Sequence, residues 1–174
     1  MRVRRYWFFV VVVVVSVAGL AAVNTWGAVT EKQLSLSGIK AVSVFVQGVS
    51  AEAEKAGLTV EQIEAEVKAK LEGTGIKVVG EREGEELSGK PALYVNLSAP
   101  KRRQKAAFVY HVEVGLMQEV TLVRDEKIRI MSITWKKGSL GYCPARSFVE
   151  NVQRSLGDMM DAFVGDWAAA NRKL

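Results

Sequence analysis

The single cysteine and the single histidine are the residues of this chain best suited to chemistry. Cys143 lies in the segment GYCPAR, just ahead of a predicted helix, and a helix N-terminus can lower the pKa of a thiol and make it nucleophilic. His111 lies beside Glu113 in a predicted strand, and a nearby imidazole could act as the general base for the thiol. A Cys143–His111 pair is therefore the enzymatic hypothesis, that of a small exported hydrolase. No third group that would orient the histidine can be placed, so a semi-buried cysteine and a surface histidine are the favoured interpretation.

Other catalytic or metal-binding arrangements find little support. A metal site needs three or four ligands, and one histidine, one cysteine and scattered carboxylates show no ligand spacing. Asp158 and Asp161 are three residues apart on a predicted helix, so they are neighbours, whereas a glycosidase needs two carboxyl groups facing each other about 5–9.5 Å apart. We expect no catalytic residues, no metal and no cofactor.

Basic and aromatic side chains suggest binding instead. The segment KRRQK puts four positive charges on one turn, which could meet lipid headgroups, an anionic polymer or an acidic partner. The same charges could also be a solvated loop that protects a sheet edge. Trp135 and Tyr142 flank a glycine-containing loop, where they could form a binding floor or pack between sheet and helix. The candidate binding surface comprises Lys101, Arg102, Arg103, Lys105, His111, Glu113, Trp135, Lys136, Lys137 and Tyr142.

These side chains must be positioned mainly by strands. Alternating apolar residues predict strands over 39–47, 76–81, 91–99 and 128–135, and the clearest alternation covers 108–123. A straight strand of that length would span roughly 54 Å, so we expect a bend or bulge near Gly115 or Gln118. The acidic segment 81–90 and the segment 136–145 are predicted loops, and RDEK at 124–127 is a predicted hairpin turn.

Two helices are predicted. Thr59 and Gln62 form a capping box ahead of an apolar stripe that ends at Gly73, and a longer, more apolar helix covers about 146–171. The order β-α-β-β-β-β-α predicts an α+β, two-layer sandwich: a mainly antiparallel sheet of about five strands with two helices on one face. The first β-α-β unit could contain one parallel pair.

The N-terminal segment indicates where this domain works. Residues 6–23 carry no charge, and as a helix they would measure roughly 27 Å, close to the thickness of a bilayer core. Three arginines precede this run, and no Asp, Glu or Lys occurs before Glu31. We therefore expect an exported, periplasmic protein in which 1–28 is a signal peptide or an N-terminal membrane anchor, 29–37 a tether and 38–174 a single domain. If the leader is kept, it tethers the domain to the inner membrane.

The net charge and the domain organisation together suggest a class of function. The formal charge of +5 falls to +2 without residues 1–28, because three arginines and no acids are lost, and the basic turn has no interleaved aromatic residues. Nucleic acid is therefore not an expected partner. The leader with a small α+β domain resembles, in general plan, accessory domains of the bacterial envelope. The leading hypothesis is a non-enzymatic envelope module that binds an envelope protein or an anionic envelope component. The alternatives are a carrier of a lipid or other apolar ligand, and the Cys143/His111 hydrolase.

Overall fold

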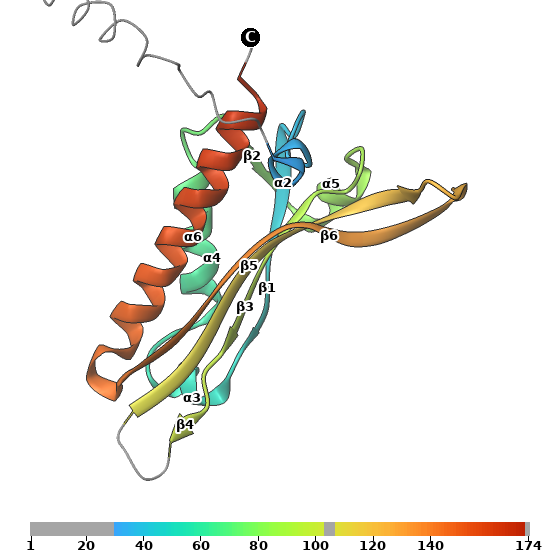
Figure 1. Ribbon diagram of the computed structural model, residues 1–174. Coiled ribbons are helices and arrows are strands. Elements are labelled where there is room, and N and C mark those ends of the chain that lie inside the picture. Colours follow the sequence, from blue (N-terminus) through green and yellow to red (C-terminus); the bar gives the residue numbers. More distant parts are fainter. Residues whose placement is uncertain (1–29, 103–106, 173–174) are drawn as a thin grey trace, which may run out of the picture.

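The protein has an α+β fold, seen in a computed structural model that describes residues 30–102 and 107–172 (Figure 1). The expected leader at 1–28 and two residues of the basic turn, Arg103 and Lys105, lie outside the described residues. The helices are α2 (Glu31–Leu34), α3 (Ala51–Lys55), α4 (Val60–Leu71), α5 (Glu81–Glu86) and α6 (Phe148–Ala170), with a 3-10 turn at Ala145–Ser147. The strands are β1 (Ala41–Val49), β2 (Lys77–Val79), β3 (Ala92–Ser98), β4 (Lys101–Arg102), β5 (Ala107–Leu122) and β6 (Asp125–Pro144).

These strands form one mixed sheet. The order is β2-β1-β3-β5, with the two-residue β4 and the long β6 both paired to β5. The strand β1 is parallel to β2, as the β-α-β pattern predicts, and it is also parallel to β3. All pairs that involve β5 are antiparallel, and β5 pairs with β6 along nearly its whole length.

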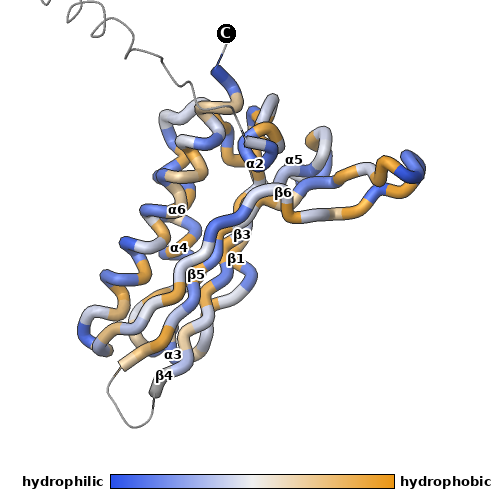
Figure 2. The backbone as a smooth tube through the Cα atoms, viewed as in Figure 1, coloured by the Kyte–Doolittle hydropathy of each residue, from blue (hydrophilic) through white to orange (hydrophobic). Residues whose placement is uncertain are grey.

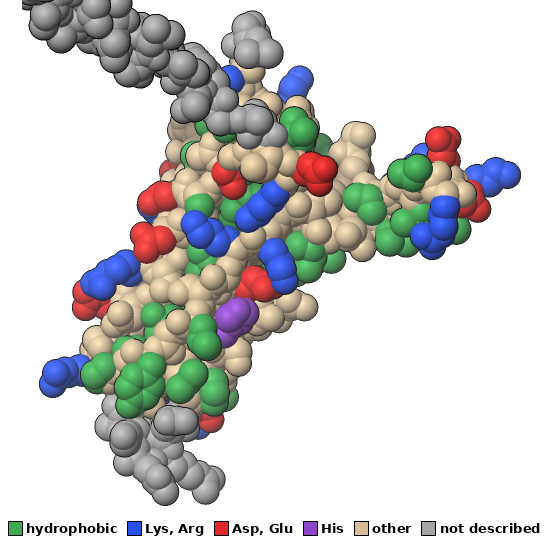
Figure 3. All heavy atoms as spheres, in the orientation of Figure 1, with side chains coloured by type: hydrophobic (Ala, Val, Ile, Leu, Met, Phe, Trp, Pro, Cys, Tyr) green, Lys and Arg blue, Asp and Glu red, His purple; other side chains and the backbone are tan. Residues whose placement is uncertain are grey.

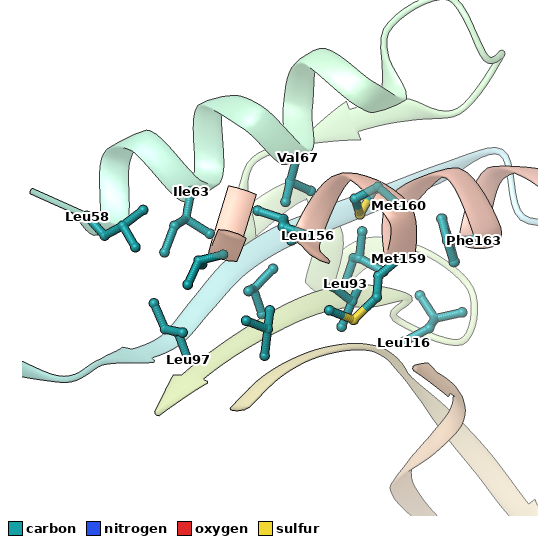
Figure 4. Packing of buried hydrophobic residues seen from close by; sticks show 14 of the residues in the cluster. Leu58, Ile63, Val67, Leu93, Leu97, Leu116, Leu156, Met159, Met160 and Phe163 are labelled. Carbon is teal, nitrogen blue, oxygen red and sulfur yellow. The ribbon is translucent and has the colours of Figure 1, made fainter. Parts of the chain in front are cut away.

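The two long helices cover one face of the sheet, which confirms the predicted two-layer plan (Figure 1). Leu156, Met160 and Phe163 of α6 lie among the apolar side chains of the sheet and of α4 (Figure 4). The Nζ atom of Lys70 on α4 is 2.7 Å from the Asp161 carboxylate on α6, so an ion pair joins the two helices at the surface. The helix α4 begins at the predicted capping box of Thr59 and Gln62.

The segment 81–90, predicted to be a loop, contains the helix α5. This helix lies on the opposite face of the sheet, where a Cβ at Gly84 would be 2.8 Å from the Cβ of Ser43. Four glutamates and one arginine in EREGEE are compatible with a surface helix. The sequence prediction treated acidity and one glycine as loop signals, but the close approach of Gly84 to β1 fixes the helix instead.

The described part of the predicted tether is packed onto the domain. Thr30 and Gln33 form a capping box that starts α2, and Leu36 is fully buried in the core. Asn171, just beyond α6, accepts a hydrogen bond from the Gly38 amide and donates one to the Leu36 carbonyl. The compact body therefore includes residues before 38, because the buried leucine and these hydrogen bonds hold the segment.

The segment 136–145, predicted to be a loop, forms the second half of β6 up to Pro144, and Ala145 begins the 3-10 turn. Gly138 and Gly141 suggested a loop, but both are strand residues, paired with Glu113 and Tyr110 of β5. The predicted irregularity near Gly115 or Gln118 is present as a register shift between Leu116 and Met117. The additional residue is on the partner strand, at Thr134, and β5 itself continues.

In the part of the chain that the structure describes, no helix has both the length and the apolar character needed to cross a bilayer.

Candidate functional site

The sheet face that α4 and α6 leave uncovered carries an exposed apolar cluster around the histidine. We call Val109, His111, Leu140 and Tyr142 the open-face patch. Val109 is the direct cross-strand partner of Tyr142, and His111 is that of Leu140, so both pairs project from the same face. Leu140 is 75% exposed and Tyr142 is 57% exposed. In Figure 3 the histidine, the only one in the chain, lies beside a group of hydrophobic side chains on the visible surface.

A glycine shapes the middle of this face. A Cβ at Gly138 would lie 3.2 Å from His111 Nε2, so the imidazole extends over the backbone of β6 at that position. The side chain of His111 is exposed. The patch is therefore a shallow, solvent-facing surface in which aromatic and aliphatic groups flank an imidazole, a composition suited to contact with a partner.

A partly buried hydrogen bond borders the open-face patch. The Tyr94 hydroxyl donates to Glu113 Oε1 at 2.7 Å, and the Lys136 Nζ atom is 3.5 Å from Glu113 Oε2. Burial raises the pKa of the Tyr94 hydroxyl, and the hydrogen bond to the Glu113 carboxylate together with its charge raises that pKa further. The Glu113 carboxylate therefore already has two partners in the same chain, and it links Tyr94 of β3 to Lys136 of β6.

The predicted basic turn is described only in part. Lys101 and Arg102 form β4, and they pair with Phe108 and Ala107 at the end of β5 that is nearest the open-face patch. The backbone register therefore brings this basic segment to the same end of the sheet as Tyr142, which pairs with Val109. Lys136 and Lys137 are neighbours along β6, so their side chains point to opposite faces of the sheet.

The predicted surface residue Trp135 belongs to the core. Its side chain is 1% exposed, and its ring meets Phe163 edge to face at a centroid distance of 5.1 Å. The indole Nε1 donates to Asp166 Oδ2 at 2.9 Å, and Lys32 Nζ lies 4.5 Å above the ring. Packing of Trp135 against the last helix was one of the two interpretations that the sequence allowed, and it is the arrangement found.

Cys143 and His111 point to opposite sides of the sheet. Cys143 pairs with Phe108 on the core face and is buried, whereas His111 lies on the open face. Burial also raises the pKa of the Cys143 thiol, which lowers its thiolate fraction at neutral pH. The geometry keeps the imidazole away from the thiol, so the two do not form the pair on which the hydrolase alternative depends.

The carboxylates on α6 have structural partners. Asp161 is ion-paired with Lys70, as described above, and Asp166 accepts hydrogen bonds from Trp135 and from Gln33 of α2. Asp158 is exposed. Within residues 30–102 and 107–172, no group of three or more His, Cys, Asp or Glu side chains is arranged to hold a metal ion.

The sequence interpretation missed Val109 and Leu140. Leu140 fell in a predicted loop, although Leu140 and Tyr142 alternate with Gly141 and Cys143 as strand residues do. That alternation was the available signal, and the two glycines obscured it. The interpretation also missed the exposed apolar residues of the β5–β6 hairpin, because an alternating strand was expected to have one buried face.

No protein-family model matches the chain, and no curated protein matches it. The solved structures that it resembles include PelC from Paraburkholderia phytofirmans, a dodecamer. One PelC structure, of a single-residue variant, has 13% sequence identity and a TM-score of 0.42, over 71% of this chain and 85% of that chain. A second PelC dodecamer structure has 12% sequence identity and a TM-score of 0.41, over 84% of this chain and 94% of that chain. The hypothetical protein CT253 from Chlamydia trachomatis has 10% sequence identity and a TM-score of 0.43, over 74% of this chain and 98% of that chain. These similarities are too distant to assign a family or a function to this chain.

Proposed function

We propose that this protein is an exported, non-enzymatic module of the bacterial envelope that binds another envelope component through the open-face patch. The observation that carries the proposal is the exposure of Leu140 and Tyr142, two large side chains on the open face of the sheet. Exposed apolar groups that gather beside polar ones are typical of interaction surfaces. The apolar leader with its preceding arginines supports export.

The position of the basic segment favours an anionic partner or an anionic region on a protein partner. Lys101 and Arg102 pair with β5 next to the patch, and the register places Tyr142 opposite Val109 at that same end. The backbone of these two basic residues thus lies at one border of the apolar patch, and we propose that their positive charge attracts the partner. Such charge increases the rate of encounter and the sensitivity to salt more than it increases affinity.

The binding proposal can be tested with matched leucine variants of the full chain. Leu140→Asp places a charge in the open-face patch, whereas Leu34→Asp changes a similarly exposed leucine on α2. Each tagged variant is used to capture components from solubilised envelope membranes, which are then identified by mass spectrometry. We expect a component that the wild type and Leu34→Asp retain and that Leu140→Asp loses. Equal recovery with both variants, or nothing above background with the wild type, would refute a role for the patch.

Export is tested separately. We expect the protein in cells to fractionate with the periplasm, or with the inner membrane if the leader is retained. Sequencing the N-terminus of the purified protein distinguishes the two cases. A chain that begins at Met1 and stays in the cytosol would contradict the proposed location without bearing on the patch.

A further inference from the structure

The strands β5 and β6 extend beyond the rest of the sheet as a two-stranded hairpin (Figure 1). We call residues 117–133 the arm. The last β3 pairing on β5 is at Met117, and from there β5 pairs only with β6 among the described strands. At about 3.4 Å per residue, the six steps along the strand from Met117 to Val123 give the arm a reach of about 20 Å. A hairpin that projects this far receives little support from the core.

The arm exposes apolar side chains on both of its faces. Ile130 pairs with Val120 and the adjacent Met131 pairs with Glu119, so these two side chains lie on opposite faces. The side chains of Ile128, Ile130, Met131 and Ile133 are each between 41% and 46% exposed. Figures 2 and 3 show hydrophobic residues distributed along the arm among charged ones. An isolated two-stranded hairpin is marginally stable in water, so an arm of this composition gains from a partner.

The outer edge of the arm presents unpaired backbone groups. The Glu119 amide donates to the Gly89 carbonyl at 2.8 Å, on the side away from β6. Glu119 and Met131 are therefore a non-hydrogen-bonded pair of the β5–β6 ladder, and the amide and carbonyl of Met131 point away from β5. Because the direction repeats every two residues, the backbone groups of Arg129 and Ile133 point the same way. In the described part of the chain β6 pairs with β5 alone.

The helix α2 covers the next part of this edge. The Ser35 hydroxyl donates to the Thr134 carbonyl at 3.2 Å, and Lys32 Nζ donates to the Lys136 carbonyl at 2.7 Å. Thr134 is also the additional residue at the register shift. The regularly paired and uncovered part of the edge is therefore Arg129–Ile133, which we call the open edge.

The open edge is suited to a protein strand rather than to lipid. A bilayer core offers no hydrogen-bond partners to backbone groups, whereas an added strand pairs with them directly. The only charge in this segment is Arg129, whose Nη1 is 3.6 Å from Glu119 Oε2 of the same chain. An identical segment laid antiparallel across the open edge would bring no two like charges opposite each other.

We propose that the open edge pairs antiparallel with the open edge of a second copy of this chain, about a two-fold axis at Met131. Met131 is the midpoint of the segment, so Arg129 lies opposite Ile133 of the second copy, and Met131 lies opposite its own counterpart. The outward-pointing residues then form three hydrogen-bonded pairs. The two arms shield one another's exposed isoleucines and methionines. Self-pairing uses the arm and not the open-face patch, so it is independent of the proposed function.

Charge variants at the axis test the self-pairing. The full chain is purified in a mild detergent, and its mass is measured by sedimentation. We expect the wild type to dimerise, Met131→Lys and Met131→Glu each to be monomeric, and an equimolar mixture of the two variants to dimerise again, because opposite charges then meet at the axis. Val123→Lys, at the tip of the arm, is the control that keeps the dimer. A wild type that stays monomeric at high concentration, or a mixture that does not recover, overturns the proposal.

Single cysteines test the register. In a Cys143→Ala background, the full chain carries either Met131→Cys or Arg129→Cys and is oxidised with diamide. At the axis two cysteines face each other at about 5.5 Å between Cα atoms, within disulfide reach, whereas the Cα atoms of two cysteines at position 129 would be about 15 Å apart. We expect a disulfide dimer only from Met131→Cys. Equal yields, no dimer, or a cross-link to another protein would refute self-pairing. Release of the chain from membranes by Met131→Lys, without any cross-link at 131, would assign the arm to lipid and also refute it.

Discussion

The ring of Tyr110 lies against Gly141 on the neighbouring strand, so closely that no Cβ could be accommodated there. The two residues are direct cross-strand partners of β5 and β6. The same arrangement occurs between β3 and β5, where the ring of Tyr94 lies against Gly115. In both the β3–β5 and the β5–β6 pair, a tyrosine thus covers the backbone of its partner glycine, which compensates for the absent side chain.

Alanine at either glycine should destabilise the fold. Gly141→Ala and Gly115→Ala force a buried tyrosine ring to move, which we expect to cost about 1–3 kcal/mol. Gly165→Ala is the control, because nothing lies within 4 Å of a Cβ at that position of α6. That change should be stabilising by about 0.5–1 kcal/mol, since alanine favours helix. Chemical denaturation gives all three values, and equal effects at Gly141 and Gly165 would contradict the packing described.

Asp166 should be the carboxylate of α6 that matters most for stability. Asp166→Ala leaves the buried indole N–H of Trp135 without its acceptor and removes the contact with Gln33. We expect a loss of about 1–3 kcal/mol. Asp158→Ala, on the exposed side of the same helix, should change stability by less than about 0.5 kcal/mol. If thermal denaturation showed similar losses for both variants, the hydrogen bond to Trp135 would not be a significant anchor.

The Tyr94–Glu113 hydrogen bond should make stability fall in alkaline solution. The folded protein raises the pKa of Tyr94 above its usual value of 10.0, so above about pH 10 the unfolded chain releases this proton and the folded chain retains it. The stabilisation is therefore fully present below pH 10 and is lost as the pH rises towards the folded pKa. Tyr94→Phe should flatten this part of the stability profile, measured by denaturation between pH 8 and 12 in a series of buffers. An unaltered slope in Tyr94→Phe would show that other groups cause it.

Cys143 should react slowly with thiol reagents in the native state. Its side chain is buried on the core face, and burial raises its pKa, so both access and thiolate fraction are low. We expect labelling at neutral pH to be at least about tenfold slower than in the chain unfolded by urea, which is the internal control. A labelling rate in the native state that equals or exceeds the rate in urea would contradict this prediction and indicate a reactive cysteine.

Local sequence patterns predicted much of this fold. The capping box at Thr59 and Gln62, the alternation of 108–123 and the apolar stripe of the last helix each specify an element through interactions within a few residues. These elements, taken in order, indicated the two-layer α+β arrangement. The leader is likewise identified by local charge and hydropathy, and its fate in the cell stays a prediction.

Tertiary structure decided the features on which the proposals depend. Whether Gly138 and Gly141 belong to a loop or to a strand depends on β5, whose backbone pairs with both and whose Tyr110 ring covers one of them. Trp135 is buried because Phe163 and Asp166, far along the chain, lie against it. The exposure of the arm follows from where β3 ends relative to β5. Such contacts join residues that are distant in sequence. A local pattern of residue types cannot predict them, because it reflects only interactions within a few residues.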